Sequence, residues 1–273
     1  TGPIGVFDSG YGGLTILDKI RGLMPEYDYI YLGDSARCPY GPRSFEVVYE
    51  FTLQAVSKLF ELGCPLVILA CNTASAKALR TIQQINLPVI DATRRVLGVI
   101  RPTAECIGEI TRSRHVGILA TAGTIKSESY LLEIHKLSPD IVVTGEACPM
   151  WVSLVENNEY QSEGADYFVK QHINRLLDKD PMIDTIILGC THYPLLLDKI
   201  RQFTPGHIRI IAQGEYVARS LQDYLNRHPE MDARCEKGGK CRFLTTESEN
   251  KFEESASIFL GRQDIKVESI ALE

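Results

Sequence analysis

The sequence predicts an α/β fold of two similar lobes, each a mainly parallel sheet flanked by helices. Short apolar runs alternate with segments of helical period, which is typical of βα units. The chain also contains an internal repeat, because Leu-Val-Ile-Leu-Ala-Cys-Asn-Thr at 66–73 resembles Ile-Ile-Leu-Gly-Cys-Thr-His at 186–192. A second, weaker similarity relates residues 4–10 to residues 116–123. Each of these segments precedes one of the two cysteine segments by a similar number of residues. Repeated order at repeated spacing indicates two related lobes.

Seven strands and one long helix can be placed on the sequence. The strands are expected in the short apolar runs at 4–7, 29–32, 66–70, 116–120, 141–144, 185–188 and 208–211. A helix is predicted between the second and third strands, because apolar residues from Phe45 to Phe60 recur at three- and four-residue spacing. Ser44 is expected to cap this helix and Gly63 to close it.

The expected strands divide into a first lobe, 1–99 with 213–273, and a second lobe, 100–212. Each lobe has one cysteine, Cys71 or Cys190, directly after a buried strand. Ligands of such sheets bind at the carboxyl ends of the strands. The active site is therefore expected in the cleft between the lobes, with one thiol on each side of a small molecule.

Length and composition place the chain among ordinary enzymes and binding proteins. Its 273 residues are 44% hydrophobic and 23% charged, which argues against disorder. A formal net charge of -6 disfavours a nucleic-acid partner, which needs clustered Lys and Arg. No apolar stretch reaches membrane-spanning length. The eight cysteines are scattered along the chain, so we expect reduced thiols in a cytoplasmic protein.

The two cysteines that follow strands point to proton transfer at a stereocentre. A single free cysteine is most often inert and buried, but Cys71 and Cys190 each precede a helix, whose N-terminus favours a thiolate. Neither has the close second cysteine that redox exchange normally uses. Inverting an α-carbon needs a base on one face and an acid on the other. A thiol, with a pKa of about 8.5, can serve as either near neutrality.

The turn at 8–13 after the first strand is the next informative feature. Its glycines let backbone N–H groups approach an anion at a helix start, so we interpret it as a carboxylate-binding turn, with Asp8 beside a thiol or a substrate ammonium. The rival interpretation is the dinucleotide-binding loop of a dehydrogenase, with Asp34 as the ribose-binding acid. Thr15 stands where that motif needs its last glycine, which disfavours it.

Three further residues lie close to these motifs in the sequence or carry chemistry of their own. His192 follows Cys190 by two residues, so a strand end and its turn can aim both side chains into one cleft. Glu156 would by default be a solvated acid at a helix end, and Cys38 is interpreted as structural. Because the cysteines and histidines show no recognised four-ligand spacing, no metal site is expected.

Five motifs resemble those of the cofactor-independent glutamate racemases of the aspartate/glutamate racemase superfamily. F-D-S-G-Y-G-G, L-G-D-S-A-R-x-P-Y-G, A-C-N-T-A-S, A-C-P-x-x-V-x-L-V-E and L-G-C-T-H-Y-P occur in the family order over roughly the whole chain. The resemblance implies a cytoplasmic isomerase without cofactors that supplies D-glutamate for peptidoglycan, and so serves cell wall biogenesis and cell shape. It implies a homodimer and no membrane or direct nucleic-acid partner.

The resemblance also implies a role for each site residue. Cys71 and Cys190 would form the acid/base pair, with Asp8 assisting Cys71, and with His192 and Glu156 assisting Cys190. Substrate contacts would fall on Asp8, Ser9, Tyr40, Gly41, Asn72, Thr73, Thr121, Thr191 and His192.

Departures from the family pattern leave other functions open. Residues 91–95 look like an insertion, Arg101 differs from the family's usual residue, and Ala212-Gln213-Gly214 replaces Asp-Ser-Gly. These changes concern regulation, the lobe hinge and subunit contacts more than chemistry. Aspartate racemisation is the nearest alternative function. A binding or regulatory protein that kept the fold without catalysis is the alternative of another class.

Overall fold

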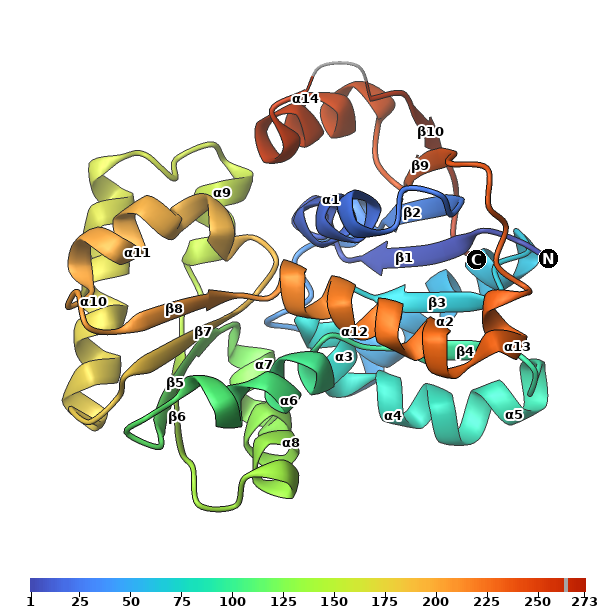
Figure 1. The fold of residues 1–273 in the computed structure, drawn as a ribbon. Coiled ribbons are helices and arrows are strands. Elements are labelled where there is room, and N and C mark those ends of the chain that lie inside the picture. Colours follow the sequence, from blue (N-terminus) through green and yellow to red (C-terminus); the bar gives the residue numbers. More distant parts are fainter. Residues whose placement is uncertain (263–264) are drawn as a thin grey trace.

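The computed structural model describes residues 1–262 and 265–273 and contains two lobes, each built on a parallel sheet (Figure 1). The first lobe holds a six-stranded sheet in the order β10-β9-β2-β1-β3-β4, and the second a four-stranded sheet in the order β6-β5-β7-β8. Every strand pair in both sheets is parallel, which confirms the predicted fold class. The strands are β1 (Ile4–Asp8), β2 (Tyr29–Gly33), β3 (Leu66–Leu69), β4 (Arg95–Leu97), β5 (His115–Ala120), β6 (Val142–Ala147), β7 (Thr185–Gly189), β8 (Arg209–Ala212), β9 (Cys241–Thr245) and β10 (Val267–Ser269).

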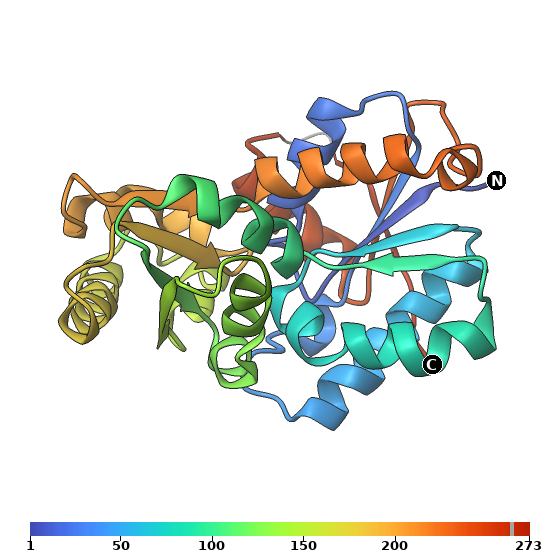
Figure 2. The same cartoon turned by 60° about the horizontal axis from the view of Figure 1, so that its bottom comes forward.

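Helices cover both faces of the six-stranded sheet (Figure 2). Side chains alternate along a strand, so Val6 of β1 belongs to one core cluster with Leu17 and Leu221, while the next residue, Phe7, belongs to another with Val56. The helices of this lobe are α1 (Leu14–Leu23), η1 (Ser35–Arg37), α2 (Phe45–Glu61), α3 (Asn72–Lys77), α4 (Leu79–Thr81), η2 (Ile82–Asn86), α5 (Leu87–Ile90), α12 (Gly214–Arg227), α13 (Pro229–Asp232) and α14 (Glu249–Leu260).

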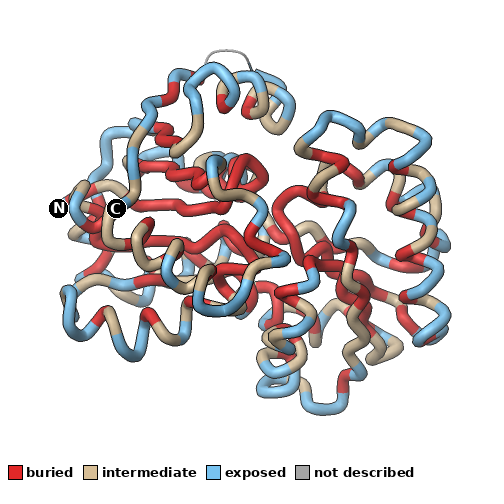
Figure 3. Tube along the Cα trace, turned by 180° about the vertical axis from the view of Figure 1, so that it is seen from behind, coloured by how far each residue is buried: buried red, intermediate tan, exposed pale blue. Residues whose placement is uncertain are grey.

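The second sheet is covered in the same way, and the strands of both lobes form buried centres (Figure 3). In β7, Ile186 packs with Trp151 and Ile173, whereas Ile187 packs with Ile107 on the opposite face. The helices of this lobe are α6 (Ile100–Ile110), α7 (Ala122–Ser127), α8 (Ser129–Leu137), α9 (Trp151–Glu156), α10 (Glu163–Lys179), η3 (Tyr193–Leu196) and α11 (Leu197–Phe203). Among the described residues, none of the helices is long and apolar enough to cross a membrane.

All seven predicted strands are present, with ends that differ by at most three residues. The predicted helix is α2, in which Ser44 accepts a hydrogen bond from Val47 N (3.3 Å) as the N-cap. Gly63 follows it with φ of 93°, a backbone conformation that suits glycine. The sequence interpretation missed β4, β9 and β10, because their apolar stretches are short or interrupted by charged residues.

The segment 91–95 ties the end of α5 to the edge strand β4. The Asp91 carboxylate accepts hydrogen bonds from Thr93 N (2.9 Å) and Arg94 Nε (3.0 Å). Arg94 also donates to the carbonyls of Phe60 and Cys64, at the end of α2. The apparent insertion is therefore a turn that packs within the first lobe.

Sheet topology brings the carboxyl ends of four strands together between the lobes, those of β1 and β3 in the first and of β5 and β7 in the second. In the first lobe β1 lies between β2 and β3, and in the second β5 lies between β6 and β7, so the strand order reverses at each of these points. Ligands of open parallel sheets bind at such reversal points, outside the carboxyl ends of the strands. The arrowheads of β1 and β8 point toward the opposite lobe, so both binding edges face the junction (Figure 1).

Candidate active site

A cavity at the junction is lined by both motif cysteines. It holds about 330 Å³ of space not filled by protein atoms, part of which is open to solvent. Its lining includes ten of the predicted site residues but neither Asp8 nor Glu156, and it adds Cys38, Pro39 and Val152, which were not predicted. The lining is Ser9, Cys38, Pro39, Tyr40, Gly41, Cys71, Asn72, Thr73, Thr121, Val152, Cys190, Thr191 and His192.

Cys71 lies between β3 and α3 and is the N-cap of that helix. Its Sγ accepts a hydrogen bond from Ala74 N at 3.4 Å and donates one to Ser9 Oγ at 3.5 Å. The side chain is 5% exposed and lines the cavity from the first lobe. The strand end and the helix start therefore hold this sulfur at the junction, as the sequence pattern predicts.

Burial outweighs the helix N-terminus, which was expected to favour a thiolate at Cys71. Burial, together with the nearby Asp8 carboxylate, raises the pKa of the Cys71 thiol to about 12. The Ala74 N–H and the Ser9 hydroxyl lower this pKa, but burial outweighs them because a charged sulfur loses its hydration. Cys71 is therefore a neutral thiol, ready to act as an acid.

Asp8 organises the glycine turn from within. One carboxylate oxygen, Oδ2, accepts hydrogen bonds from Gly10 N (3.1 Å) and Gly13 N (2.9 Å). These two N–H groups bind the protein's own carboxylate and are therefore not free to bind an outside anion. The other oxygen, Oδ1, is buried and accepts no hydrogen bond from the described residues. Burial raises the pKa of Asp8, although His192 and the two N–H groups oppose the shift.

Cys190 lies after β7, and His192 connects it to Glu156. His192 Nδ1 lies 3.9 Å from Cys190 Sγ, and Nε2 of the same ring is hydrogen-bonded to the Glu156 carboxylate at the end of α9. Burial alone would lower the pKa of His192, but its bonds to the Cys190 sulfur and the Glu156 carboxylate raise it well above its ordinary value. A cationic imidazole therefore stands between the Glu156 carboxylate and the Cys190 sulfur.

Asp34 supports the loop that carries Tyr40 and Gly41. It is fully buried and accepts hydrogen bonds from the Tyr40 hydroxyl, from Arg37 Nε at 2.7 Å and from Thr246 Oγ1 at 2.8 Å. With its oxygens engaged in this way, Asp34 cannot bind a ribose hydroxyl. This arrangement removes the main support for a dinucleotide-binding loop.

Close contacts join the two lobes around the cavity. Thr73 Oγ1 of the first lobe lies 3.0 Å from Thr121 Oγ1 of the second, within hydrogen-bonding distance. Gly41 N-terminal to α2 lies against the same threonine, because a Cβ at position 41 would stand 2.8 Å from Thr121 Cβ. At Gly12 a Cβ would come within 2.4 Å of Thr191 Oγ1. Glycine at both positions therefore permits the lobes to meet around the site.

A buried polar network behind Asn72 was missed by the sequence interpretation. Gln213 accepts a hydrogen bond from Asn72 Nδ2 (2.8 Å) and donates to Thr103 Oγ1 (3.0 Å) and the Tyr130 hydroxyl (2.5 Å). The Tyr130 hydroxyl in turn donates to Asn72 Oδ1. Gln213 lies in Ala212-Gln213-Gly214, the segment noted as a departure from the family pattern, and this departure was the available signal. The network fixes the amide of Asn72 at the cavity wall.

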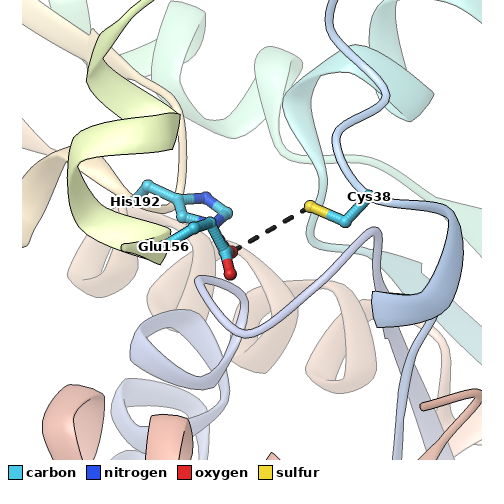
Figure 4. Close-up of side chains that lie close together, drawn as sticks. All are labelled: Cys38, Glu156 and His192. Carbon is cyan, nitrogen blue, oxygen red and sulfur yellow. Dashed lines mark hydrogen bonds and ion pairs between the residues drawn. The ribbon is translucent and has the colours of Figure 1, made fainter. Parts of the chain in front are cut away.

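Cys38 lies in the cavity wall beside the acid–imidazole pair, which the structural interpretation of this residue did not anticipate (Figure 4). Its Sγ is 4.0 Å from Glu156 Oε1. One potential ligand atom each from Cys38, Glu156 and His192 lies within 4.8 Å of the others. Sequence spacing could not predict this group, because its members come from three distant segments of the chain.

Comparisons with known proteins agree with this architecture. The family model described as Asp/Glu/Hydantoin racemase matches residues 15–221. A glutamate racemase from Ruegeria sp. (strain TM1040) is 38% identical over 270 residues, which cover 95% of this chain and 97% of that protein. The crystal structure of a glutamate racemase isoform from Bacillus anthracis has a TM-score of 0.89 at 36% identity, covering 99% of this chain and 98% of that one. That of the Francisella tularensis glutamate racemase in complex with D-glutamate has a TM-score of 0.86 at 31% identity, with the same coverage. The chain belongs to the Asp/Glu/Hydantoin racemase family.

Proposed function

We propose that this chain is a glutamate racemase, an isomerase that interconverts L- and D-glutamate by acid/base catalysis with two thiols and no cofactor. The observation that carries the proposal is that Cys71 and Cys190, each at the carboxyl end of a strand in a different lobe, line one cavity. Similarity to glutamate racemases over nearly the full chain supports glutamate as the substrate.

In the proposed reaction, the sulfur of one cysteine takes the α-proton as a thiolate and becomes a thiol. The other cysteine delivers a proton to the opposite face of the α-carbon and becomes a thiolate, so the stereocentre is inverted. The raised pKa of Cys71 suits it to the acid role at the start of one direction. The reverse reaction exchanges the two roles.

We assign supporting roles to three charged side chains. His192, held by Glu156, places positive charge beside the Cys190 sulfur. Asp8 acts on Cys71 through its charge, which stabilises the thiol form. Its unpartnered Oδ1 suits a cationic group, although Asp8 is not part of the cavity wall. A substrate ammonium would have to approach it by a small opening of the turn.

We assign substrate binding to the polar groups of the cavity wall, which apart from the His192 imidazole are neutral donors and acceptors. Hydroxyl and amide groups can hydrogen-bond the carboxylates of glutamate without adding fixed charge. The assigned residues, apart from Asp8, are Ser9, Tyr40, Gly41, Asn72, Thr73, Thr121, Thr191 and His192. We also propose lobe boundaries at 99/100 and 212/213, because each boundary lies between a strand of one sheet, β4 or β8, and the helix that follows it.

Solvent isotope exchange tests the reaction. L-glutamate incubated with the protein in deuterated water should yield D-glutamate carrying deuterium at Cα, measured by chiral chromatography and mass spectrometry. Cys71→Ser and Cys190→Ser should each lower the rate by about 10²–10⁴-fold, the usual contribution of a positioned acid or base. Exchange that is absent under reducing conditions, or that survives both substitutions, would rule out this mechanism and favour a binding or regulatory role. Faster turnover of aspartate than of glutamate would make aspartate the substrate.

We further propose a cytoplasmic homodimer that supplies D-glutamate for peptidoglycan, as the family resemblance implies. Exposed apolar side chains on η2 and α5, Ile85, Val89 and Ile90, support association with a second copy, because such patches often mark interfaces. Light scattering should give twice the mass of one chain, and Val89→Glu should lower it. Expression should also remove the D-glutamate requirement of a bacterium that lacks its own glutamate racemase.

A further inference from the structure

Three potential metal ligands converge at one side of the cavity. Cys38 comes from the loop after η1, Glu156 from the last turn of α9, and His192 from the turn before η3. Their side chains point toward one another in Figure 4. The Cys38 Sγ, a Glu156 carboxylate oxygen and a His192 ring nitrogen all lie within 4.8 Å of one another.

The spacing of these atoms is close to that of a tetrahedral metal site. Zinc bonds of about 2.0–2.3 Å place neighbouring ligand atoms roughly 3.5 Å apart. Cys38 Sγ and Glu156 Oε1, at 4.0 Å, would need to approach slightly, while the hydrogen-bonded Glu156 and His192 atoms would need to separate by a small amount. The three side chains could therefore bind one ion if their ligand atoms moved by an ångström or less.

The turn after β1 leaves room for this group. A Cβ at Gly10 would lie 3.1 Å from Cys38 Sγ and 3.4 Å from Glu156 Oε1, so glycine allows both atoms to stand close to the backbone. Cys38 and His192 line the cavity, and the Glu156 side chain is 21% exposed. An ion can therefore reach the group from the substrate side.

We propose that Cys38, Glu156 and His192 bind a thiophilic divalent cation, of which Zn²⁺ fits best, and that the bound ion inhibits the enzyme. A thiolate, an imidazole and a carboxylate are the ligands of zinc, whereas Mg²⁺ and Ca²⁺ prefer oxygen alone. Three protein ligands leave the fourth position to water, as in other open zinc sites. Metal binding itself is independent of the proposed function, whereas the inhibition rests on it.

Inhibition follows from the bonds that the ion replaces. Zn²⁺ takes the thiol proton's place on Cys38 and the proton's place on His192 Nε2, and both protons pass to solvent. The His192 imidazole keeps its proton on Nδ1, which faces Cys190. The ring itself is then neutral and no longer hydrogen-bonded to Glu156. The ion also occupies the cavity wall beside Cys190, so substrate and metal compete for the same space.

Cobalt and zinc titrations of the full chain, without substrate, test the site. Co²⁺ should give the thiolate-to-cobalt charge-transfer band, and Zn²⁺ should displace it. Cys38→Ser and Glu156→Gln should each weaken Zn²⁺ binding by at least about 100-fold, because even groups one shell further out are worth 10–100-fold. The paired substitution Cys71→Ser with Cys190→Ser should retain the band, and Cys106→Ser, at a partly buried cysteine on α6, should match the unsubstituted protein.

Racemase assays in the presence of Zn²⁺ supply the second measurement, with each variant compared with its own metal-free rate. Inhibition should be reversed by a chelator and should need far more Zn²⁺ in Cys38→Ser than in Cys106→Ser. Circular dichroism shows whether each variant is folded, and two independent ligand variants keep the test valid if one is not. Unchanged Zn²⁺ affinity in a folded Cys38→Ser or Glu156→Gln protein overturns the proposal, as does loss of the band in the Cys71→Ser, Cys190→Ser protein. Metal binding without racemase activity would refute the proposed function alone.

Discussion

At the scale of single residues, burial controls the charge of the first thiol. Cys71 sits at a helix N-terminus, where a thiolate would normally be stabilised, and it accepts a hydrogen bond from Ala74 N. Burial nevertheless raises the pKa of its thiol to about 12. The free enzyme therefore keeps this group as an acid, while His192 places positive charge next to Cys190. The two thiols therefore lie in different electrostatic surroundings, as inversion by an acid on one face and a base on the other requires.

The raised pKa of Cys71 predicts a loss of stability at alkaline pH. The folded protein holds the thiol proton up to about pH 12, whereas the unfolded chain releases it near the ordinary value of 9.0. The contribution is therefore complete below pH 9 and is lost between about pH 9 and pH 12. From pH 7 to pH 10, the free energy of unfolding should fall by about 1 kcal/mol more in the unsubstituted protein than in Cys71→Ala. Urea unfolding under reducing conditions measures this difference, and equal losses would show that Cys71 is not held as a thiol.

At the scale of elements, the turn between β1 and α1 of the first lobe packs against the turn of the second lobe that follows Cys190. A Cβ at Gly12 would stand 2.4 Å from Thr191 Oγ1 and 2.8 Å from His192 Nδ1. These distances are far shorter than a van der Waals contact, so the lobes can approach this closely only with glycine at position 12. Asp8 holds the same turn by its bonds to Gly10 N and Gly13 N.

Substitution of this glycine should damage catalysis more than folding. Gly12→Ala should lower kcat/KM by at least about tenfold, since an ångström-scale displacement of a reacting group can cost 10²-fold. Gly22→Ala is the matched control, because no heavy atom lies within 4 Å of its added Cβ in α1. The control should retain activity and gain up to about 1 kcal/mol of stability. Steady-state kinetics and thermal unfolding of both variants measure these two effects. Normal activity in Gly12→Ala would contradict the close contact.

At the scale of the whole molecule, Gln213 joins the lobes where the chain passes from β8 to α12. Its amide bonds to Asn72 of the first lobe and to Thr103 and Tyr130 of the second. All four side chains are buried. Thr103 also donates to Val99 O and Tyr130 to Asn72 Oδ1, so removal of the Gln213 amide chiefly leaves the buried Asn72 Nδ2 without its partner. The network therefore couples the position of Asn72 at the cavity to the relative placement of the lobes.

Gln213→Met tests this coupling because methionine has a similar length without the amide. The free energy of unfolding should fall by about 1–3 kcal/mol for the unpaired groups, and KM for glutamate should rise because Asn72 loses its partner. Gln202→Met, at an exposed position of α11, should change stability by no more than about 0.5 kcal/mol. Urea unfolding and steady-state kinetics provide both readouts. A stable variant with unchanged KM would show that Gln213 does not position Asn72.

The sequence by itself determined the βα architecture, the long strands and the placement of both thiols after buried strands. These features depend on local patterns, such as the apolar runs before Cys71 and Cys190 and the capped helix from Ser44. The short strand β4 was not predicted, because three residues carry too little pattern and pairing with β3 determines its conformation.

Only the tertiary structure decided which groups meet and which charge state burial favours. Asp8 turns its carboxylate to Gly10 N and Gly13 N, Gln213 bonds across both lobes, and Cys38 lies beside Glu156. These contacts join residues whose spacing in sequence carries no periodic signal. Packing determines such distances and the loss of hydration at each group, and both depend on the whole fold rather than on any local run of residues.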